Sequence, residues 1–494
     1  MERARPPRKR RWIRFLGLGL VALLVVMVTR GVLNGPEAFD PGPAPALPAV
    51  DPALAAERLA TAVRIETITP DPAHPERVEA MEALHAYLER EFPRVHQAME
   101  REVVSELSLL YRWPGSDPAA EPILLLAHMD VVPVEPGTEG DWTRPPFSGD
   151  IVDGVIWGRG TMDDKAGVIG LMSAAERLLE AGFVPARTLV IAMGHDEEVG
   201  GTQGAKVIAE QLESRGERFM FVLDEGGAII SEAIPGLDRQ AAMVGVAEKG
   251  HATIEVTLQG EGGHSSMPPP QGSIGRLAEA VRRLEDDPMP AQIEGATRMM
   301  LETMAPHMRM DMRIALSNLW VLSPAIERVL AARPASNATL RTTLAPTMFD
   351  AGIAPNVLAS KAMVTFNSRI MPGQTVDDVM EHVREVIDEP DAEIRCTKCW
   401  EPSAISSVDD EGFDVVRRAI AHVFPDVVTV PYLVVGATDS RYYSHLARAT
   451  YRFLPLRMRA ADRKRMHGTD EQNTVEGMAD GVRFYMAVMM LAAG

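Results

Sequence analysis

Residues 123–130 read Ile-Leu-Leu-Leu-Ala-His-Met-Asp, an apolar run that ends in an imidazole and a carboxylate. A short apolar run of this kind is typical of a buried strand, and open α/β sheets place their sites just beyond such strands. An imidazole two residues from a carboxylate suits a metal ligand whose second ring nitrogen is held in place. Taken alone, however, His128 and Asp130 are more typical of an ordinary polar loop.

The same pattern recurs along the chain. Strands expected at 188–193 and 219–223 are followed by acidic or imidazole residues, and helices are expected at 166–181 and 204–215. This alternation predicts an α/β sheet with crossover helices. The polar groups that end core elements are His128 with Asp130, Asp163 with Asp164, His195 to Glu198, Asp224 with Glu225, and His467.

Strand ends meet at one edge of a sheet, so these groups are expected to share a site. Two histidines and several carboxylates suit a two-metal centre of zinc, cobalt or manganese, with an aspartate bridging the ions. The adjacent Glu197 and Glu198 allow one carboxylate to bind a cation while its neighbour acts as general base. For Asp163 and Asp164, capping of the following helix is the alternative.

Composition places the chain among globular proteins. It has 494 residues, 46% hydrophobic and 24% charged, which predicts two or three domains. The net charge of -19 is concentrated after a basic N-terminus. An acidic body without a basic, aromatic stripe excludes nucleic acid as a partner.

The N-terminal segment predicts contact with a membrane. Basic residues in Met1 to Arg14 precede an apolar run, 15–28, that flanking residues extend to 33. A cleaved export signal is the alternative, but no small-x-small cleavage site follows, which favours an uncleaved anchor. The positive flank places the N-terminus in the cytoplasm and the rest of the chain outside it, either anchored or secreted.

Composition shifts suggest five segments. We expect a basic and apolar segment at 1–35, a proline-rich linker at 36–50, a first part of the main domain at 51–246, an inserted domain at 247–403, and the rest of the main domain at 404–494. The inserted segment is expected to hold strands at 250–260, 362–370 and 393–400 and helices at 273–285 and 376–387.

The motifs resemble a known family, the di-zinc metallopeptidases that include aminoacylase, carboxypeptidase G and carboxypeptidase S. The likeness spans roughly residues 51–494 and is closest to the branch of carboxypeptidase S and N-fatty-acyl-amino-acid hydrolases. It rests on Leu-Leu-Ala-His128-Met-Asp-Val-Val-Pro133, Gly-His195-Asp-Glu-Glu-Val-Gly-Gly201 and Gly436-Ala-Thr-Asp-Ser-Arg-Tyr442. Ala437 departs from the glycine usual in related sequences.

The resemblance implies a role for each matching residue. One zinc would be held by His128 and Asp224, the other by Glu198 and His467, with Asp163 bridging both. Asp130 would orient His128, and Glu197 would be the general base for hydrolysis of an amide bond. The implied substrate is a small molecule or peptide in which that bond lies next to a free carboxylate.

The resemblance also implies an α/β fold in which a mixed-sheet catalytic domain carries an inserted α+β lid. The lid would occupy 247–403 and could join two copies of the chain. His264 would help to hold the developing oxyanion, in some members from the partner subunit; a solvated lid histidine is the alternative. Arg369 and, more weakly, Asn356 are candidates for binding the substrate carboxylate, whereas a buried structural ion pair explains Arg369 nearly as well. Asp439 and Arg441 could contact the substrate or support the metal ligands.

Two features of the insertion are open to more than one interpretation. The methionines of 287–350 could line a groove for a long acyl group, or could serve helical packing or a dimer contact. Cys396 and Cys399 are spaced C-x-x-C in an expected strand, where residues i and i+3 face opposite sides, so no disulfide is expected.

Two alternatives to an acyl-amino-acid amidohydrolase or carboxypeptidase remain. A dipeptidase acting on ordinary peptides would use the same metal chemistry. A non-catalytic, membrane-anchored binding protein predicts loss of a ligand or of Glu197, and all of these residues are present.

Overall fold

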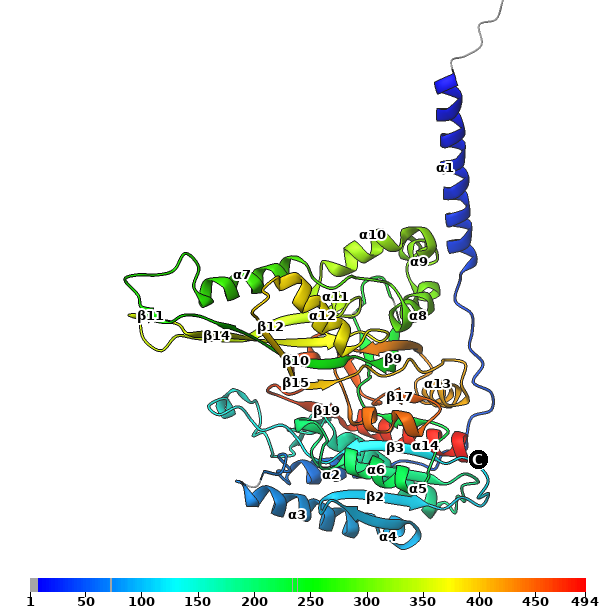
Figure 1. The fold of residues 1–494 in the computed structure, drawn as a ribbon. Coiled ribbons are helices and arrows are strands. Elements are labelled where there is room, and N and C mark those ends of the chain that lie inside the picture. The colour runs from blue at the N-terminus through cyan, green and yellow to red at the C-terminus, as the bar shows by residue number, and fades with distance from the viewer. Residues whose placement is uncertain (1–7, 72, 233, 238) are drawn as a thin grey trace, which may run out of the picture.

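The computed structural model describes residues 8–494 apart from 72, 233 and 238, with side chains described from residue 15 onward. Residues 1–7 of the predicted basic segment Met1 to Arg14 therefore lie outside the described part. Helix α1 (Arg8–Leu33) stands clear of the body for most of its length (Figure 1). Residues 34–50 contain no helix or strand, as their prolines predict, and α2 (Pro52–Val63) begins at the cap residue Asp51.

A mixed ten-stranded sheet forms the centre of the body (Figure 1), which confirms the α/β prediction. The strand β3 (Ile123–His128) lies between β6 (Leu189–Gly194) and β7 (Val222–Asp224) and runs parallel to both. The other strands are β1 (Glu100–Val104), β2 (Ser108–Trp113), β8 (Ile229–Ser231), β9 (Gln240–Glu248), β16 (Val427–Val434), β17 (Thr450–Arg452) and β18 (Arg457–Arg459).

Helices cover both faces of this sheet, which explains why β6 and all of β3 before His128 are apolar. Ile123 and Leu125 belong to the core beneath one helical layer, and Leu124 and Leu126 to the core beneath the other. The first layer contains α2, α5 (Lys165–Glu180), α13 (Glu411–Val423) and α14 (Val475–Ala493), and the second contains α6 (Ala205–Ser214). Helices α3 (Pro75–Glu91) and α4 (Pro93–Ala98) lead into β1.

A small three-stranded sheet joins segments that are far apart in sequence. It contains β4 (Ile151–Val152), β5 (Val155–Trp157) and β19 (Gln472–Thr474). The pairing of β19 with β5 continues where the amide of Gly158 donates to the carbonyl of Glu471 at 2.9 Å. The loop that follows β5 and the loop that precedes β19 are thereby held side by side.

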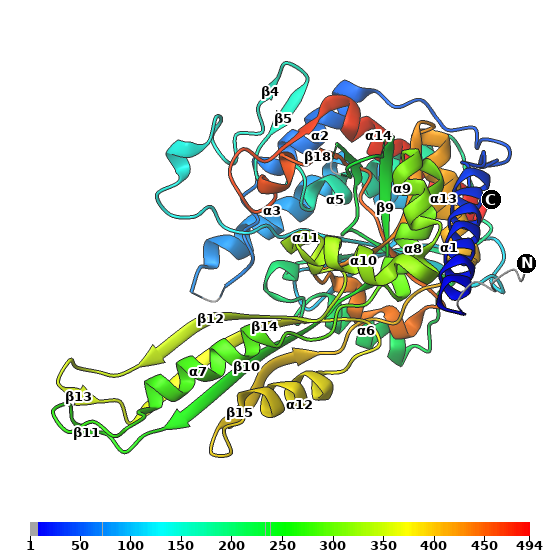
Figure 2. The same ribbon diagram turned by 90° about the horizontal axis from the view of Figure 1, so that it is seen from above.

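A four-stranded antiparallel sheet extends away from the body (Figure 2), and we call it the projecting sheet. Its strands are β12 (Thr343–Ala351), β14 (Lys361–Ile370), β10 (Gly250–Gln259) and β15 (Glu393–Trp400). Together with α7 (Ser273–Asp286) and α12 (Val376–Ile387), it encloses a separate apolar core. A short pair, β11 (Gly263–His264) with β13 (Val357–Leu358), forms its far tip.

The prediction about the two cysteines was wrong, because Cys396 and Cys399 form a disulfide with their Cα atoms 6.2 Å apart. In the pairing of β15 with β10, Lys398 lies opposite Thr253 and Cys396 lies opposite Ile254, so Thr397 is an extra, bulged residue. A bulge inserts one residue into the alternation of a strand. Residues i and i+3 therefore reach the same side, where a regular strand would separate them.

The segment between β10 and β12 adds a helical group above the sheet: α8 (Gly295–Met304), α9 (Met310–Leu316), α10 (Leu319–Ala331) and α11 (Pro334–Asn337). Met304 and Met308 are buried there against Ala241, Met243 and Val430 of the large sheet. This placement supports the packing alternative for these two methionines.

Candidate metal centre

Five segments bring their polar groups to one edge of the large sheet. His128 ends β3 and Asp224 ends β7, while Glu197 and Glu198 lie in a 3₁₀ turn shortly after β6. Asp163 comes from the glycine-containing loop before α5, and His467 from the loop before β19. The parallel arrangement of β6, β3 and β7 makes their carboxyl ends coincide.

Asp163 lies between the two histidines. Its Oδ1 is 2.9 Å from Nε2 of His128, and its Oδ2 is 3.0 Å from Nε2 of His467. These interactions lower the pKa of Asp163 although burial opposes the shift. Each oxygen of one carboxylate thus faces a different imidazole, which is the arrangement of a ligand shared by two cations.

Glu198 completes this group from the side of His467. Its Oε2 is 3.2 Å from Nε2 of that histidine, and its buried Oε1 has no hydrogen-bond partner among the described residues. Hydrogen bonds to Asp163 and Glu198 raise the pKa of His467 to about 10. His128, Asp163 and Glu198 offer ligand atoms that all lie within 4.8 Å of one another.

The neighbouring Asp164 has a separate task. Its carboxylate caps α5 by accepting from the amide of Gly167 at 3.1 Å, and it also accepts from the amide of His128 at 3.3 Å. The capping alternative therefore applies to Asp164. Asp163 keeps both oxygens for the histidines.

Asp130 links His128 to the turn that carries Glu197 and Glu198. Its Oδ1 is 3.4 Å from Nδ1 of His128 and accepts from the amide of Glu197 at 3.1 Å. Its Oδ2 accepts from the amide of Glu198 and from the hydroxyl of Thr69. Although burial opposes it, hydrogen bonds to Asp130 and Asp163 raise the pKa of His128 well above its ordinary value.

Asp224 and Glu225 differ in how their carboxylates are used. Asp224 accepts from the backbone amides of Glu225 at 2.9 Å and of Ser440 at 2.8 Å. The carboxylate of Glu225 makes no hydrogen bond to a described residue. Burial, with the nearby charges of Asp163 and Asp224, raises the pKa of Glu225 well above its ordinary value. Glu225 is therefore a ligand candidate beside Asp224, whereas the resemblance assigned only Asp224 to a zinc ion.

Glu197 is buried next to this group. Burial raises its pKa well above the ordinary value, and the carboxylates of Asp439 and Glu198 add to the rise. Both oxygens of Asp439 are buried without a hydrogen-bond partner in the described part of the chain. A side chain at Gly201 would collide with the Asp439 carboxylate, so this position requires glycine.

Glu471 fixes the loop that presents Asp163. Its Oε1 accepts from the amides of Gly160, Met162 and Asp163, and its Oε2 pairs with Arg159 at 2.7 Å. Both side chains of this ion pair are buried. The sequence does not single out Glu471, because nothing local distinguishes a carboxylate that holds a loop from a metal ligand.

The donor set fits two divalent cations. Imidazoles and carboxylates are the ligands that zinc, cobalt and manganese share, and the group contains two imidazoles and at least three carboxylates. So many buried carboxylates repel one another unless positive charge lies between them. The buried Oε1 of Glu198, which has no hydrogen-bond partner among the described residues, can bind a cation.

Cations gather between the projecting sheet and the turn that carries Glu197 and Glu198. Arg441 donates to the carbonyl of Gly200 at 2.7 Å, and its guanidinium lies 4.9 Å from the ring centre of Trp400. Lys398 and Arg441 both flank Gly200, with atoms 3.5 and 3.8 Å from where a β-carbon would lie. Burial and the charge of Arg441 lower the pKa of Arg369. We call Arg369, Lys398 and Arg441 the cation cluster, and none of them pairs with a described carboxylate within 4 Å.

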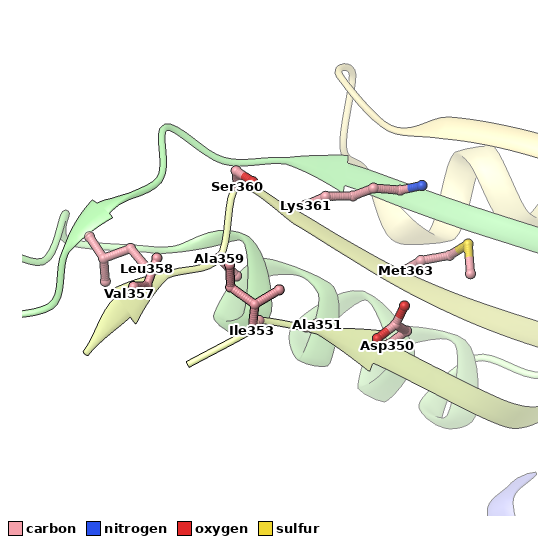
Figure 3. Close-up of a pocket in the computed structure, with 10 residues that line it drawn as sticks. Asp350, Ala351, Ile353, Val357, Leu358, Ala359, Ser360, Lys361 and Met363 are labelled. Atoms are coloured by element: carbon pink, nitrogen blue, oxygen red, sulfur yellow. The ribbon is translucent and has the colours of Figure 1, made fainter. Parts of the chain in front are cut away.

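His264 and Asn356 are not brought to the metal centre. They lie together at the tip of the projecting sheet, where both are exposed and the amide of Ser265 donates to the Asn356 carbonyl at 3.2 Å. A pocket of about 200 Å³ lies beside this tip, between Asp350, Ile353, Val357 and Lys361 (Figure 3). The pocket contains none of the metal-centre residues.

Comparison with known proteins identifies the family. Residues 124–491 match the model of peptidase family M20/M25/M40. The chain is 37% identical to a probable carboxypeptidase S-like 2 of Dictyostelium discoideum over 96% of this chain and 92% of that protein. It is also 37% identical to the human N-fatty-acyl-amino acid synthase/hydrolase PM20D1 over 96% of both.

A solved structure shows the same fold. An M20 family metallo-carboxypeptidase from Sulfolobus solfataricus superposes with a TM-score of 0.66 at 17% identity, over 89% of this chain and 99% of that one. Fold and site thus define a metal-dependent hydrolase of amide bonds. The chain belongs to peptidase family M20/M25/M40 and is a metallopeptidase or amidohydrolase, as its motifs predicted.

Proposed function

We propose that the protein hydrolyses an amide bond next to a free carboxylate, using two zinc ions, for which cobalt or manganese could substitute. The observation that carries this proposal is the placement of Asp163, whose two oxygens face His128 and His467 at 2.9 and 3.0 Å. We propose His128 with Glu225 or Asp224 on one ion and Glu198 with His467 on the other. The segment 247–403 would be the lid.

Glu197 can transfer the proton that hydrolysis of the amide bond requires. When bound, the two cations would polarise the scissile carbonyl and lower the pKa of a water molecule. Glu197 would accept a proton from that water and return it to the departing amine, so that no covalent intermediate is needed. The backbone hydrogen bonds from Glu197 and Glu198 to Asp130 fix the position of this base relative to the metal ligands.

The cation cluster supports recognition of a carboxylate. Burial and the charge of Arg441 lower the pKa of Arg369, so a bound carboxylate would relieve the repulsion between these two guanidinium groups. Arg441 itself also has acidic neighbours, because Asp439 and Glu197 raise its pKa although burial opposes the rise. Lys398 and Arg441 lie beside the turn that carries Glu197, so a carboxylate bound there would hold the adjacent amide near the base. This arrangement favours Arg369 as an anion-binding residue over the structural ion pair.

A substrate panel tests the function directly. The full-length protein loaded with zinc is incubated with N-acyl amino acids of different chain lengths, their carboxamide analogues, and dipeptides, and products are measured by mass spectrometry. We expect cleavage of N-acyl amino acids and little cleavage of the carboxamides. Turnover of dipeptides alone would assign a dipeptidase, and no turnover with two zinc ions bound would support a binding protein.

Replacing Arg369 by methionine should weaken substrate binding. Loss of a charged hydrogen-bonding partner costs about 1.5–3 kcal/mol, so KM for an N-acyl amino acid should rise roughly 10–100-fold with a smaller change in kcat. The carboxamide analogue should be affected far less. Arg384→Met, on the exposed surface of α12, is the matched control. An equal loss for both substrates would contradict a role in carboxylate binding.

We further propose that the tip of the projecting sheet completes the site of a second copy of the chain. The exposed His264 lies at the far end of this sheet, where it is available to another subunit (Figure 2). In a homodimer formed through the projecting sheets, this imidazole would help to hold the developing oxyanion.

Mixing two inactive variants distinguishes a site that is completed by His264 of a second copy from a site formed within one chain. His264→Ala and Glu197→Gln proteins should each be nearly inactive, whereas a re-equilibrated mixture should recover roughly a quarter of wild-type activity, because half of the dimers contain one intact site. Mixing His264→Ala with itself is the control. A mixture that stays inactive although heterodimers are present would contradict the proposal.

We propose that α1 anchors the protein in a membrane with the body outside the cytoplasm. Residues Phe15–Leu33 have a mean hydropathy of 2.3, and only 6% of the most apolar window is buried. The Cys396–Cys399 disulfide supports an oxidising compartment. An export signal that is later removed would give a secreted protein in the same compartment.

A further inference from the structure

The helices α9 and α10 contact the C-terminal part of α1. The side-chain amide of Asn318, between α9 and α10, donates to the carbonyl of Met27 at 2.9 Å. Asn34 donates to the hydroxyl of Ser317 at 2.8 Å, and a β-carbon at Gly31 would collide with Ile314. The body is therefore fixed to the apolar helix at a defined level.

That level lies inside the apolar span. Met27 precedes the end of the span at Leu33 by six residues, which is ~9 Å along a helix at 1.5 Å per residue. Helices that lie in a membrane interface are buried about 5–10 Å into the boundary between headgroups and acyl chains. A bilayer that holds α1 would thus reach the junction of α9 and α10, which lie on the edge of the body from which α1 rises (Figure 1).

The outer face of α10 is apolar. Trp320 is 55% exposed and Val329 is 69% exposed, while Pro324 and Ala325 between them are also exposed. Arg328 is the one charged residue among the described residues of this face. A helix on the surface of a soluble protein normally presents polar residues to water. The opposite face of α10 faces the protein, where Leu319, Ile326 and Leu330 pack into the core under α8.

The residues around this face suit the boundary of a bilayer. Tryptophan is enriched at that boundary, and arginine can place its charge among the headgroups. Arg30 lines a hollow of about 530 Å³ between α1 and α10, together with the apolar Leu33, Leu316 and Trp320. Arg298 and Glu302 also line it and pair with each other at 3.4 Å, so the charge of Arg30 is the one that matches an anionic headgroup above its acyl chains.

We propose that α9 and α10 form a second membrane contact, in which the outer face of α10 lies in the interface of the bilayer that α1 spans. The proposal rests on the proposed anchoring by α1. It holds the body against the membrane surface and gives the helical insertion between β10 and β12 a role other than covering the substrate. The partner is a lipid bilayer, with anionic lipids favoured by the arginines.

A fluorescent probe that responds to its surroundings tests this contact. Cys396 and Cys399 are joined, so a single introduced cysteine can be labelled in the full chain. The test position is Val329→Cys, and the matched control is Val184→Cys, which is equally exposed at 69% but lies in the loop after α5. Leu20→Cys, in α1, reports on the anchor itself.

In lipid nanodiscs, we expect the probe at 329 to emit at shorter wavelength than the probe at 184. Nitroxide lipids should quench most of its emission and leave residue 184 unchanged, with stronger quenching when anionic lipid is included. A probe at 329 that behaves like the probe at 184, while residue 20 is quenched, would overturn the proposal and leave the anchor intact.

Two other results would also overturn it. A probe at residue 20 that remains in water would remove the anchor and the proposal together. A shift at 329 that depends on protein concentration and resists nitroxide lipids would identify a second copy of the chain as the partner. If the 329 variant fails to fold, as judged by its circular dichroism, Trp320→Cys provides the same measurement two residues after Asn318, which contacts α1.

Discussion

Replacing Glu197 by glutamine should lower kcat by about 10³-fold, the middle of the range that general acid–base catalysis contributes. The amide keeps the size of the side chain but cannot accept the proton of the attacking water at neutral pH. Because Glu197 lies next to the ligand candidate Glu198 without itself touching either histidine, the metal content should stay near that of the wild type. Steady-state kinetics and elemental analysis measure the two quantities.

The control for this variant is Glu82→Gln on the exposed side of α3, which should change neither quantity. Substrate binding to the Glu197 variant is measured separately by calorimetry and should stay close to wild type. A Glu197→Gln enzyme with more than a tenth of wild-type kcat would assign the proton transfer to another group. Loss of metal would instead make Glu197 a ligand.

Replacing Asp163 by asparagine should remove both metal ions and with them the activity. The asparagine keeps one oxygen, whereas the native carboxylate faces His128 and His467 with one oxygen each. Even groups that merely orient a ligand contribute roughly 10–100-fold to metal affinity, so loss of a shared ligand should exceed that range. Zinc titration monitored by calorimetry gives the affinity of each site.

Thermal stability should also reveal the loss of zinc binding in the Asp163→Asn protein. Wild-type protein should gain thermal stability on addition of zinc, since a ligand that binds only the folded state stabilises it. The Asp163→Asn protein should gain little, whereas Asp141→Asn, on an exposed 3₁₀ turn, should respond like the wild type. If Asp163→Asn still binds two zinc ions with unchanged affinity, Asp163 is not the bridging residue.

The central part of the fold could be predicted because its sequence signals are local. Buried parallel strands are apolar runs of six residues, and β3 and β6 were expected at nearly the observed bounds. In the inserted segment, α12 and β15 were expected at their observed bounds. The strands β8, β17 and β18 were not expected, because three residues are too few to show a periodic pattern. The longer strands β9, β12 and β16 were not expected either; β12 is exposed along most of its length and shows no alternation.

The candidate site could be predicted as a group of residues but not in its internal assignments. The motifs identify an acidic pair after β7, yet only the structure shows that the carboxylate of Asp224 accepts hydrogen bonds from the backbone amides of Glu225 and Ser440.

The disulfide was missed for a related reason. A bulge depends on the pairing of β15 with β10, and the sequence of β15 alone does not contain that information.

Asp130 has a consequence for how such an enzyme can change over evolutionary time. Its buried carboxylate links His128 to the turn of Glu197 and Glu198. Substitutions in the projecting sheet at positions away from Arg369, Lys398 and His264 can therefore accumulate without disturbing the reacting groups. New substrate preferences can arise by drift in recognition surfaces while the reaction chemistry is inherited unchanged.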